Sequence, residues 1–297
     1  MEMRDQELFA WIRERHSIYV KRTKGLPKPW TQDPILQTYR FCNVYRELDT
    51  VTQWIAHNWR MPHREDPDLW FAMVVARLVN WPESLEDIGY PVPWTNIAQP
   101  LTHREWGWCH FTDAMDLRRM RKEKLFTGAY MIHADAVHSG SKADYLAEMV
   151  LTPMWNDREK LRPTSKDTLA SFHNRLLQYR DMGRFMAGQV VADIKYVRPL
   201  SSAPDWHSWA TSGPGSQRGL NRVLGRDVKE TWFEADWLNE LQKLHARISG
   251  LIGKTNRNAT QLPTLHAQDL QNCLCEFDKY ERVRLGEGKP RSLYQGV

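Results

Sequence analysis

The sequence predicts a mainly α-helical protein that forms a single helical domain over residues 1–297. Three observations favour this class. Several segments repeat apolar residues at helical spacing, many of them open with Ser, Thr, Asp or Pro, and only residues 190–197 offer a strand alternative. The chain contains no repeat, low-complexity tract or clear linker that would divide it.

Helical elements follow one another along the chain. Residues 40–59 place apolar side chains within one arc at about 100° per residue, which predicts an amphipathic helix. A second helix begins at Asp66-Pro67 and ends at Pro82, and its nearly all-round apolar character predicts a central core element. Three prolines predict a loop over residues 91–104. Helical spacing also covers residues 104–124, 142–154, 166–180, 184–197 and 233–252.

The composition excludes several classes of protein. Of the 297 residues, 41% are apolar and 26% are charged, which is typical of a folded, soluble chain. No apolar run approaches the roughly 20 residues that span a bilayer. The first 22 residues carry charges and lack a continuous apolar stretch, unlike a secretory signal. We therefore expect a protein that works in a cytoplasm and has no membrane partner.

The cysteines and histidines do not indicate a metal site. Cys42, Cys109, Cys273 and Cys275 form no CxxC pair, and the eleven histidines form no HExxH pattern. We expect neither a metal nor another cofactor. The formal charge of +5 permits a polyanionic partner, and 14 tryptophans predict surfaces on which bases or ligand rings stack.

The first candidate constellation lies on the predicted helix 40–59. Steps of three residues place Arg40, Asn43, Arg46 and Asp49 on a slanting polar ridge, with Asp49 at the border of the buried face. A carboxylate held there would orient an amine or a ribose, and paired arginines hold phosphate oxygens. The alternative is a solvated helix face with one ion pair.

The second constellation spans residues 209–225. Gly213-Pro214-Gly215 predicts a tight turn before a helix that starts at Ser216, so that backbone N–H groups point at an anion, with Arg218 and Arg222 one helical turn apart. This arrangement is similar to the hairpin of helix-hairpin-helix DNA-binding proteins. The alternative is an ordinary Gly-Pro-Gly loop. A dinucleotide fingerprint does not fit the glycine spacing, and a Walker A loop is excluded because Ile248 stands where its first glycine is required.

Two further sets of charged residues are candidates. Glu276, Lys279 and Tyr280 share one face if their segment is helical, and Lys279 and Arg282 would close over a phosphate, unless the segment is a solvated charged terminus. Asp193 lies in an apolar run and is either catalytic or a paired structural acid. Lys195 shares its face only if the segment is a strand.

Four motifs together resemble one known set: RFCNVYRELD (40–49), FMAGQVVADIKY (185–196), WATSGPGSQRGLNR (209–222) and LCEFDKYERVRLGEG (274–288). They resemble the phage α-glutamyl/putrescinyl thymine pyrophosphorylases, also called amino acid:DNA transferases, and the related helical domain of 5-hydroxymethyluracil DNA kinases. The resemblance covers about residues 35–290. It implies a helical fold distantly related to helix-hairpin-helix DNA glycosylases.

The resemblance also implies a reaction. An amine or amino acid displaces pyrophosphate from 5-pyrophosphoryloxymethyl-deoxyuridine in DNA, and a separate DNA-base kinase supplies that substrate. Asp49 or Asp193 would take the proton of the amine. The substrate and the pyrophosphate would be bound by Arg40, Asn43, Arg46, Lys195, Glu276, Lys279 and Arg282. The DNA would be contacted by Trp206, Trp209, Gly213, Gly215, Ser216, Arg218, Gly219 and Arg222.

The alternatives belong to other functional classes. A helix-hairpin-helix glycosylase-like enzyme would need an acid after the hairpin, for which Asp227 and Asp236 are available. A non-catalytic protein that binds modified DNA would bind without reaction. A structural phage protein would show no salt-sensitive affinity for DNA.

Overall fold

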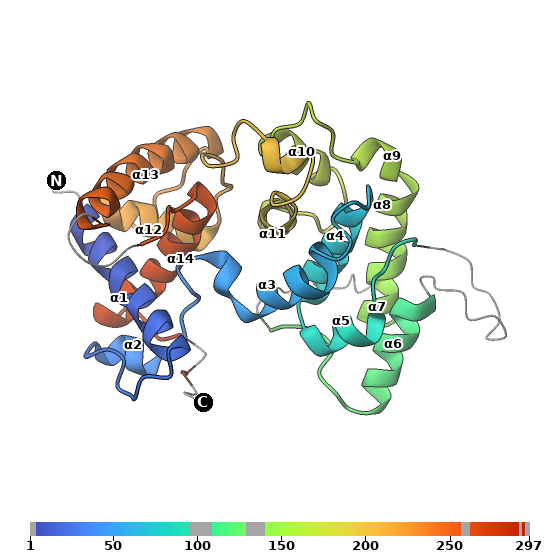
Figure 1. The fold of residues 1–297 in the computed structure, drawn as a ribbon, viewed down its shortest axis with the longest axis horizontal. Helices are drawn as coiled ribbons and strands as arrows, with labels where there is room; N and C mark the ends of the chain where they lie inside the picture. Colours follow the sequence, from blue (N-terminus) through green and yellow to red (C-terminus); the bar gives the residue numbers. More distant parts are fainter. Residues whose placement is uncertain (1–3, 95–108, 129–139, 257–261, 291–292, 295–297) are drawn as a thin grey trace. The chain divides into compact units, whose positions relative to one another are not determined.

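The computed structural model describes residues 4–94, 109–128, 140–256, 262–290 and 293–294. In these ranges the chain is helical, and its only β-type pairing is an isolated bridge between Tyr39 and Leu293 (Figure 1). The predicted mainly α class is confirmed. Residues 95–108, which include most of the predicted loop 91–104, lie outside the described ranges.

The chain divides into two compact units. The terminal unit combines residues 1–49 with residues 207–297, and the central unit comprises residues 50–206. The single domain expected over residues 1–297 therefore stays a prediction.

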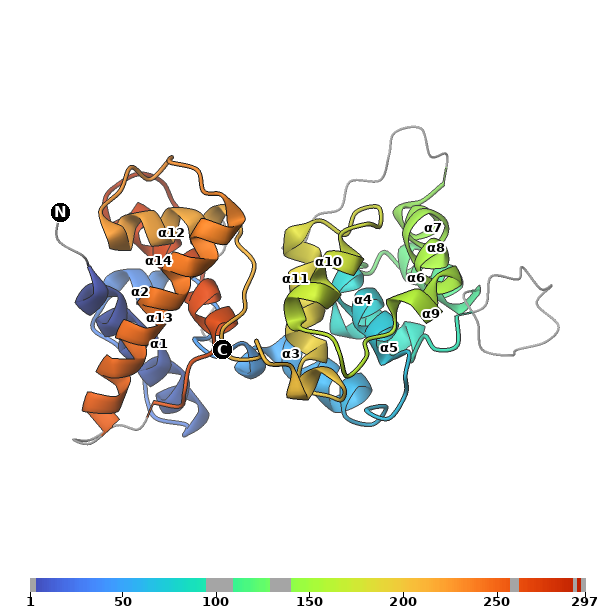
Figure 2. The same ribbon diagram turned by 90° about the horizontal axis from the view of Figure 1, so that it is seen from above.

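Helix α14 (Ala267–Arg284) organises the terminal unit. It packs against α12 (Pro214–Leu224), α13 (Glu234–Asn256), α1 (Asp5–Thr23) and α2 (Pro34–Thr38) (Figures 1 and 2). The core contains an aromatic cluster in which the Trp11 ring packs edge-on against Phe41 and Phe277, with ring centroids 6.2 and 6.1 Å apart. Such edge-on pairs add to the stabilisation that burial already provides.

Two glycines let α12 approach α14 closely. A Cβ atom on Gly219 would lie 2.1 Å from the backbone oxygen of Leu274, and one on Gly215 would lie 2.4 Å from the Cys275 Sγ. Because they are four residues apart, Gly215 and Gly219 lie on the same face of α12. They act as packing residues at the helix–helix contact.

The central unit is built around α4 (Leu69–Val79), whose eleven residues are all buried. This confirms the predicted core helix, which packs against α11 (Arg184–Ile194) (Figures 1 and 2). The other helices are α3 (Thr50–Ile55), α5 (Pro82–Ile88), α6 (Cys109–Met120), α7 (Lys142–Tyr145), α8 (Thr152–Asn156), α9 (Arg158–Leu161) and α10 (Leu169–Leu176). Short π and 3-10 turns complete the unit: Ala56–Arg60, Leu146–Leu151 and Leu200–Ser202.

The predicted single helix over residues 40–59 is wrong. Its first half is a loop with one 3-10 turn (Arg46–Leu48), and helix α3 begins only at Thr50. The backbone N–H groups of Cys42, Asn43 and Arg46 donate to carboxylates rather than to carbonyls four residues back. The slanting ridge of Arg40, Asn43, Arg46 and Asp49 therefore does not form on a helix.

Two other predictions change in detail. Residues 184–194 are helical, so Asp193 and Lys195 do not share a strand face. Helix α12 begins at Pro214 rather than at Ser216, with Gly213 as its extended N-cap residue. Proline is favoured in the first turn of a helix, because its missing N–H has no partner there in any case. The predicted tight Gly-Pro-Gly turn is therefore the start of the helix.

In the described residues, none of the helices combines the length and the apolar character that crossing a membrane requires. The same ranges hold no group of three or more His, Cys, Asp or Glu side chains arranged to hold a metal ion.

Candidate functional site

One face of α14 holds the loop of residues 40–49, called here the 40–49 loop. Asp269, Asn272, Glu276 and Lys279 recur at intervals of three or four residues and so lie along one side of the helix. Asp269 accepts the Arg46 N–H at 3.1 Å, and Glu276 Oε2 accepts the Cys42 N–H at 2.9 Å. The Asn272 amide donates to the Asn43 carbonyl at 3.2 Å. Side chains of α14 thus satisfy backbone groups of the loop that have no partner in regular secondary structure.

Arg15 of α1 supports the loop from within the unit. Its buried guanidinium donates to the carbonyl of Phe41 at 2.9 Å and to Oδ1 of Asn43 at 3.0 Å. Asn43 is itself buried, and its amide donates to the Leu48 carbonyl at 2.8 Å. Asn43 therefore organises the loop. Its side chain is buried, so the structure does not support the predicted contact with substrate.

Asp49 is held at the end of this loop. Its Oδ1 accepts the Asn43 N–H at 2.9 Å, and no group in the described ranges donates to its Oδ2. Burial raises the pKa of the Asp49 carboxyl, against the opposing effects of the Asn43 N–H and of Arg46 and Arg15. A carboxylate with one fixed oxygen and a raised pKa is suited to accept a proton.

Cationic side chains surround the loop. The Lys279 ammonium lies 2.5 Å from Glu276 and 4.7 Å from the centroid of the Phe41 ring. Arg40 is exposed at the start of the loop, and Arg46 is half-buried. The Glu276 carboxylate raises the pKa of the exposed Cys42 thiol, which disfavours the thiolate. The structure thus brings together five predicted residues, namely Asn43, Arg46, Asp49, Glu276 and Lys279.

Asp193 occupies a different environment, in the core of the central unit. Its two carboxylate oxygens accept Nε and Nη2 of Arg77 at 2.5 and 2.6 Å, and both side chains are at most 2% exposed. Arg77 also donates to Asn80 and Thr52. Of the two predicted roles, these contacts support the paired structural acid and not the catalytic base.

Lys195 and Trp206 contact each other in the central unit. The buried Lys195 ammonium lies 3.4 Å from the Trp206 carbonyl and 4.3 Å from the centroid of its ring. The Trp206 indole N–H donates to the Lys195 carbonyl at 2.7 Å. Trp209, in the terminal unit, is buried. Lys195 and Trp206 thus pack against each other within the central unit, and the roles expected for these three residues in binding pyrophosphate or DNA stay predictions.

The glycine-rich segment does not form the anion-binding turn that its sequence predicts. The Gly213 N–H donates to the Ser216 hydroxyl at 2.9 Å, which caps the helix internally. Gly215 and Gly219 face α14. Arg218 and Arg222 pair with Asp278 on the side of α14 that faces α12. Since residues two apart on a helix point about 200° apart, Asp278 and Glu276 serve separate clusters.

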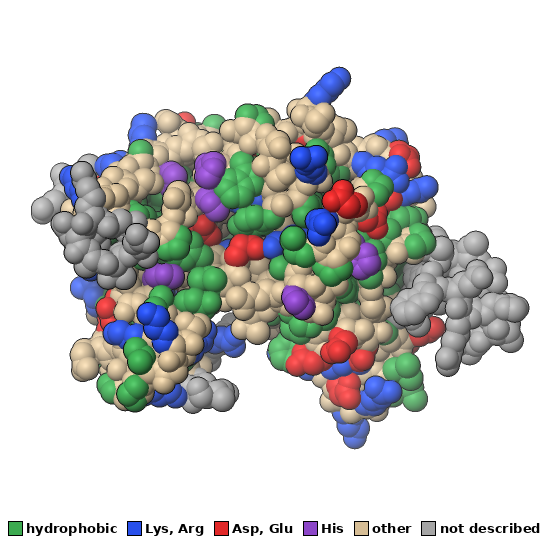
Figure 3. Space-filling view, viewed as in Figure 1, with side chains coloured by type: hydrophobic (Ala, Val, Ile, Leu, Met, Phe, Trp, Pro, Cys, Tyr) green, Lys and Arg blue, Asp and Glu red, His purple; other side chains and the backbone are tan. Residues whose placement is uncertain are grey.

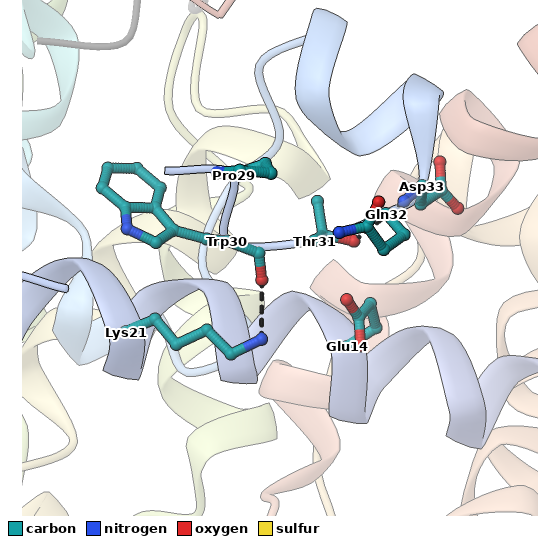
Figure 4. A pocket seen from close by; sticks show the side chains of 7 residues that line it. All are labelled: Glu14, Lys21, Pro29, Trp30, Thr31, Gln32 and Asp33. Carbon is teal, nitrogen blue, oxygen red and sulfur yellow. Dashed lines mark hydrogen bonds between the residues drawn. The ribbon is translucent and has the colours of Figure 1, made fainter. Parts of the chain in front are cut away.

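A pocket of about 410 Å³ opens between α1 and the segment before α2 (Figure 4). Its lining includes Glu14, Lys21, Trp30 and Asp33, and none of the predicted site residues. The Lys21 ammonium donates to the Trp30 carbonyl at 2.7 Å, and Asp33 accepts the Tyr280 hydroxyl at 2.6 Å. These bonds already occupy two of its polar groups, so the pocket carries no functional assignment.

The basic run at residues 118–124 is not a surface of one charge. Figure 3 shows acidic and basic side chains intermixed over α5 and α6. Arg118 lies 2.6 Å from Asp87 and 3.3 Å from Glu123, and Arg119 lies 2.9 Å from Asp116. Pairing of this kind favours a solvated face rather than a polyanion site.

Together, the fold and the site define an all-helical protein in its described ranges, with an acid and several cations gathered where a loop lies on α14. The chain belongs to the family of the helical domain of 5-hmdU DNA kinase, whose family model matches residues 3–290. This confirms the resemblance seen in the sequence. A curated relative, the 5-hmdU DNA kinase of Bacillus phage SP10, is 26% identical over 297 residues.

The alignment with this relative covers 92% of the chain but only 44% of the relative. The chain thus spans less than half the length of the kinase that it matches. No solved structure matches this chain significantly.

Sequence reasoning missed several residues that hold these clusters, namely Arg15, Arg77, Asp269, Asn272 and Asp278. Arg15 was detectable, because it stands three residues after Ile12 and three before Ile18, on the apolar stripe of α1. Asp278 was detectable in the same way, four residues after Leu274. No local signal pairs Arg77 with Asp193, because they are 116 residues apart.

Proposed function

We propose that this protein acts in the hypermodification of thymine in phage DNA. In the proposed reaction an amine, such as an amino acid or a polyamine, attacks the 5-methylene carbon of 5-pyrophosphoryloxymethyl-deoxyuridine. A C–N bond forms, the C–O bond breaks, pyrophosphate leaves, and the amine loses one proton. Membership of the helical-domain family supports a role in DNA modification. A separate DNA-base kinase would supply the pyrophosphorylated substrate, and the similarity to a phage 5-hmdU DNA kinase supports a link to that chemistry.

The observation that carries the proposal is the state of Asp49. An amine must be neutral when it attacks, so its proton needs an acceptor close to the reacting nitrogen. Asp49 offers one oxygen without a partner in the described ranges, and burial raises the pKa of its carboxyl. Asp193 is not retained for this role, because Arg77 occupies both of its oxygens.

The leaving pyrophosphate needs positive charge around it. We assign that role to Arg40, Arg46 and Lys279, which lie on the 40–49 loop or beside it on α14. Glu276 then positions Lys279 and fixes the Cys42 N–H. With a phage-encoded chain, the reaction would take place in the cytoplasm of the host cell.

The test is the substitution Asp49→Asn, which keeps an oxygen to accept the Asn43 N–H but removes the proton acceptor. We expect amine transfer to fall by about 10²- to 10⁴-fold, the usual contribution of general base catalysis. Pyrophosphorylated DNA is incubated with candidate amines, and mass spectrometry of its nucleosides is combined with an assay of released pyrophosphate.

Asp227→Asn is the matched control, because Asp227 is an exposed aspartate of the same unit. It should leave transfer unchanged. Full activity of Asp49→Asn would remove the proposed base. The glycosylase alternative would be established if the wild-type protein produced abasic sites and no new C–N bond, and if Asp227→Asn or Asp236→Asn no longer produced them.

A further inference from the structure

A cluster of three arginines surrounds one buried carboxylate between α12 and α14. The Asp278 side chain is 1% exposed. Its Oδ2 accepts the Arg218 Nε at 2.8 Å, and its Oδ1 accepts the Arg222 Nε at 2.9 Å. The Arg282 Nε lies 3.6 Å from Oδ2. A single acid thus holds Arg218 and Arg222 through hydrogen bonds to Nε and forms a longer ion pair with Arg282.

The close contact between the helices makes this arrangement possible. Gly215 and Gly219 bring the backbone of α12 against residues 274 and 275 of α14. Arg218 and Arg222, one helical turn apart, then both reach Asp278 from α12. The positions of the arginines are therefore set by rigid helices and not by a loop.

The terminal nitrogens of two of these arginines remain available, namely those of Arg218, which is held through Nε, and of Arg282, which is in an ion pair with Asp278. Arg222 donates both of its Nη groups to Glu287. Arg218 and Arg282 are 36% and 38% exposed, and no group in the described ranges accepts from their Nη atoms. Three arginines against the two carboxylates of Asp278 and Glu287 leave one positive charge uncompensated.

We propose that Arg218 and Arg282 form a binding site for a phosphate of the DNA backbone. A guanidinium presents its terminal N–H groups as a planar fork that matches phosphate oxygens. The hydrogen bond that fixes the Arg218 Nε in advance reduces the ordering that binding requires. The site lies on the α12 side of α14, whereas Glu276 faces the 40–49 loop. The proposal rests on the proposed function for one point only, that DNA is the substrate.

The experiment measures binding of a labelled, unmodified DNA duplex by fluorescence anisotropy between 50 and 200 mM salt, a range of about fourfold. In the double variant Arg218→Gln/Arg282→Gln, Asp278 keeps Arg222 as a partner. We expect its affinity at the lower salt concentration to fall about tenfold. We also expect the slope of log K against log salt to become smaller by about 0.9 for each phosphate that the variant no longer neutralises. Thermal unfolding confirms that the variant remains folded.

The matched control is Arg226→Gln/Arg284→Gln, which removes the same charge. Arg226 pairs with Glu230, and Arg284 pairs with Glu281, in each case through Nε and Nη2. The control should change affinity by less than about twofold, because each of its arginines already has two nitrogens bonded to a carboxylate. Arg218→Lys/Arg282→Lys keeps the charge without the fork and should recover only part of the affinity of the wild-type protein.

Three results would overturn the proposal. The first is an equal loss of affinity in the control pair, and the second is an unchanged affinity and salt slope in Arg218→Gln/Arg282→Gln. The third is a loss of affinity for inorganic pyrophosphate, measured by calorimetry, while the affinity for unmodified DNA is retained. The salt dependence of DNA affinity could differ between the wild-type protein and Arg218→Gln/Arg282→Gln while no amine transfer is detected. That result would support the phosphate site and contradict the proposed reaction.

Discussion

The 40–49 loop of the terminal unit and helix α11 of the central unit each hold one aspartate that the sequence singles out. In α11, Asp193 is fully buried, and both of its oxygens pair with Arg77. At the end of the loop, Asp49 is half-buried, and only its Oδ1 has a partner in the described ranges. A carboxylate with both oxygens fixed holds a core together, whereas one with a free oxygen can exchange a proton.

The largest effect on stability should come from Asp193→Asn. This substitution leaves the Arg77 guanidinium buried at 2% exposure without its counter-charge. Removing one partner of a buried ion pair costs about 3–5 kcal/mol, and we expect the free energy of unfolding to fall by that amount in urea titrations. The control Arg77→Met/Asp193→Leu removes both charges and should recover most of the loss. Wild-type stability of Asp193→Asn would contradict the structural role.

A smaller loss should follow from Gly219→Ala, which tests whether the glycines of α12 serve packing or ligand binding. The added methyl would lie 2.1 Å from the Leu274 carbonyl, so the two helices must separate. We expect a loss of about 1–3 kcal/mol, measured by thermal unfolding. Gly213→Ala is the control, because a Cβ atom there meets nothing within 4 Å. Equal stability of both variants would rule out close packing at Gly219.

The smallest effect should come from Asp49→Asn, and it should have the opposite sign. Because the folded pKa of Asp49 lies above its unfolded value of about 3.9, protonation favours the folded state. Ionised Asp49 therefore lowers stability at neutral pH, and this penalty disappears as the pH falls through the folded pKa. We expect Asp49→Asn to unfold at the same or a slightly higher temperature than the wild-type protein at pH 7. The gain in the free energy of unfolding should be under about 1 kcal/mol. A clear destabilisation at pH 7 would show that Asp49 is structural, like Asp193.

Local patterns predicted much of the fold. The apolar run from Leu69 to Val79 is a core helix, because a helix that is apolar on all sides can only be buried. The helical spacing at residues 142–154 and 233–252 likewise corresponds to helices. The pattern of residues 40–49 predicted a helix that does not form. The same spacing of apolar residues fits a loop whose backbone N–H groups bind side chains more than 200 residues away.

The sequence by itself determined the mainly α class, the central core helix and the residue types of the proposed site. It also indicated the family, because four motifs resemble that family and occur in the same order along the chain. The tertiary structure decided which of these residues meet. Whether both oxygens of an aspartate have partners depends on contacts between distant segments, such as α4 with α11 and α12 with α14. A side chain's burial, charge partner and pKa are set by those neighbours, and chain order does not specify them.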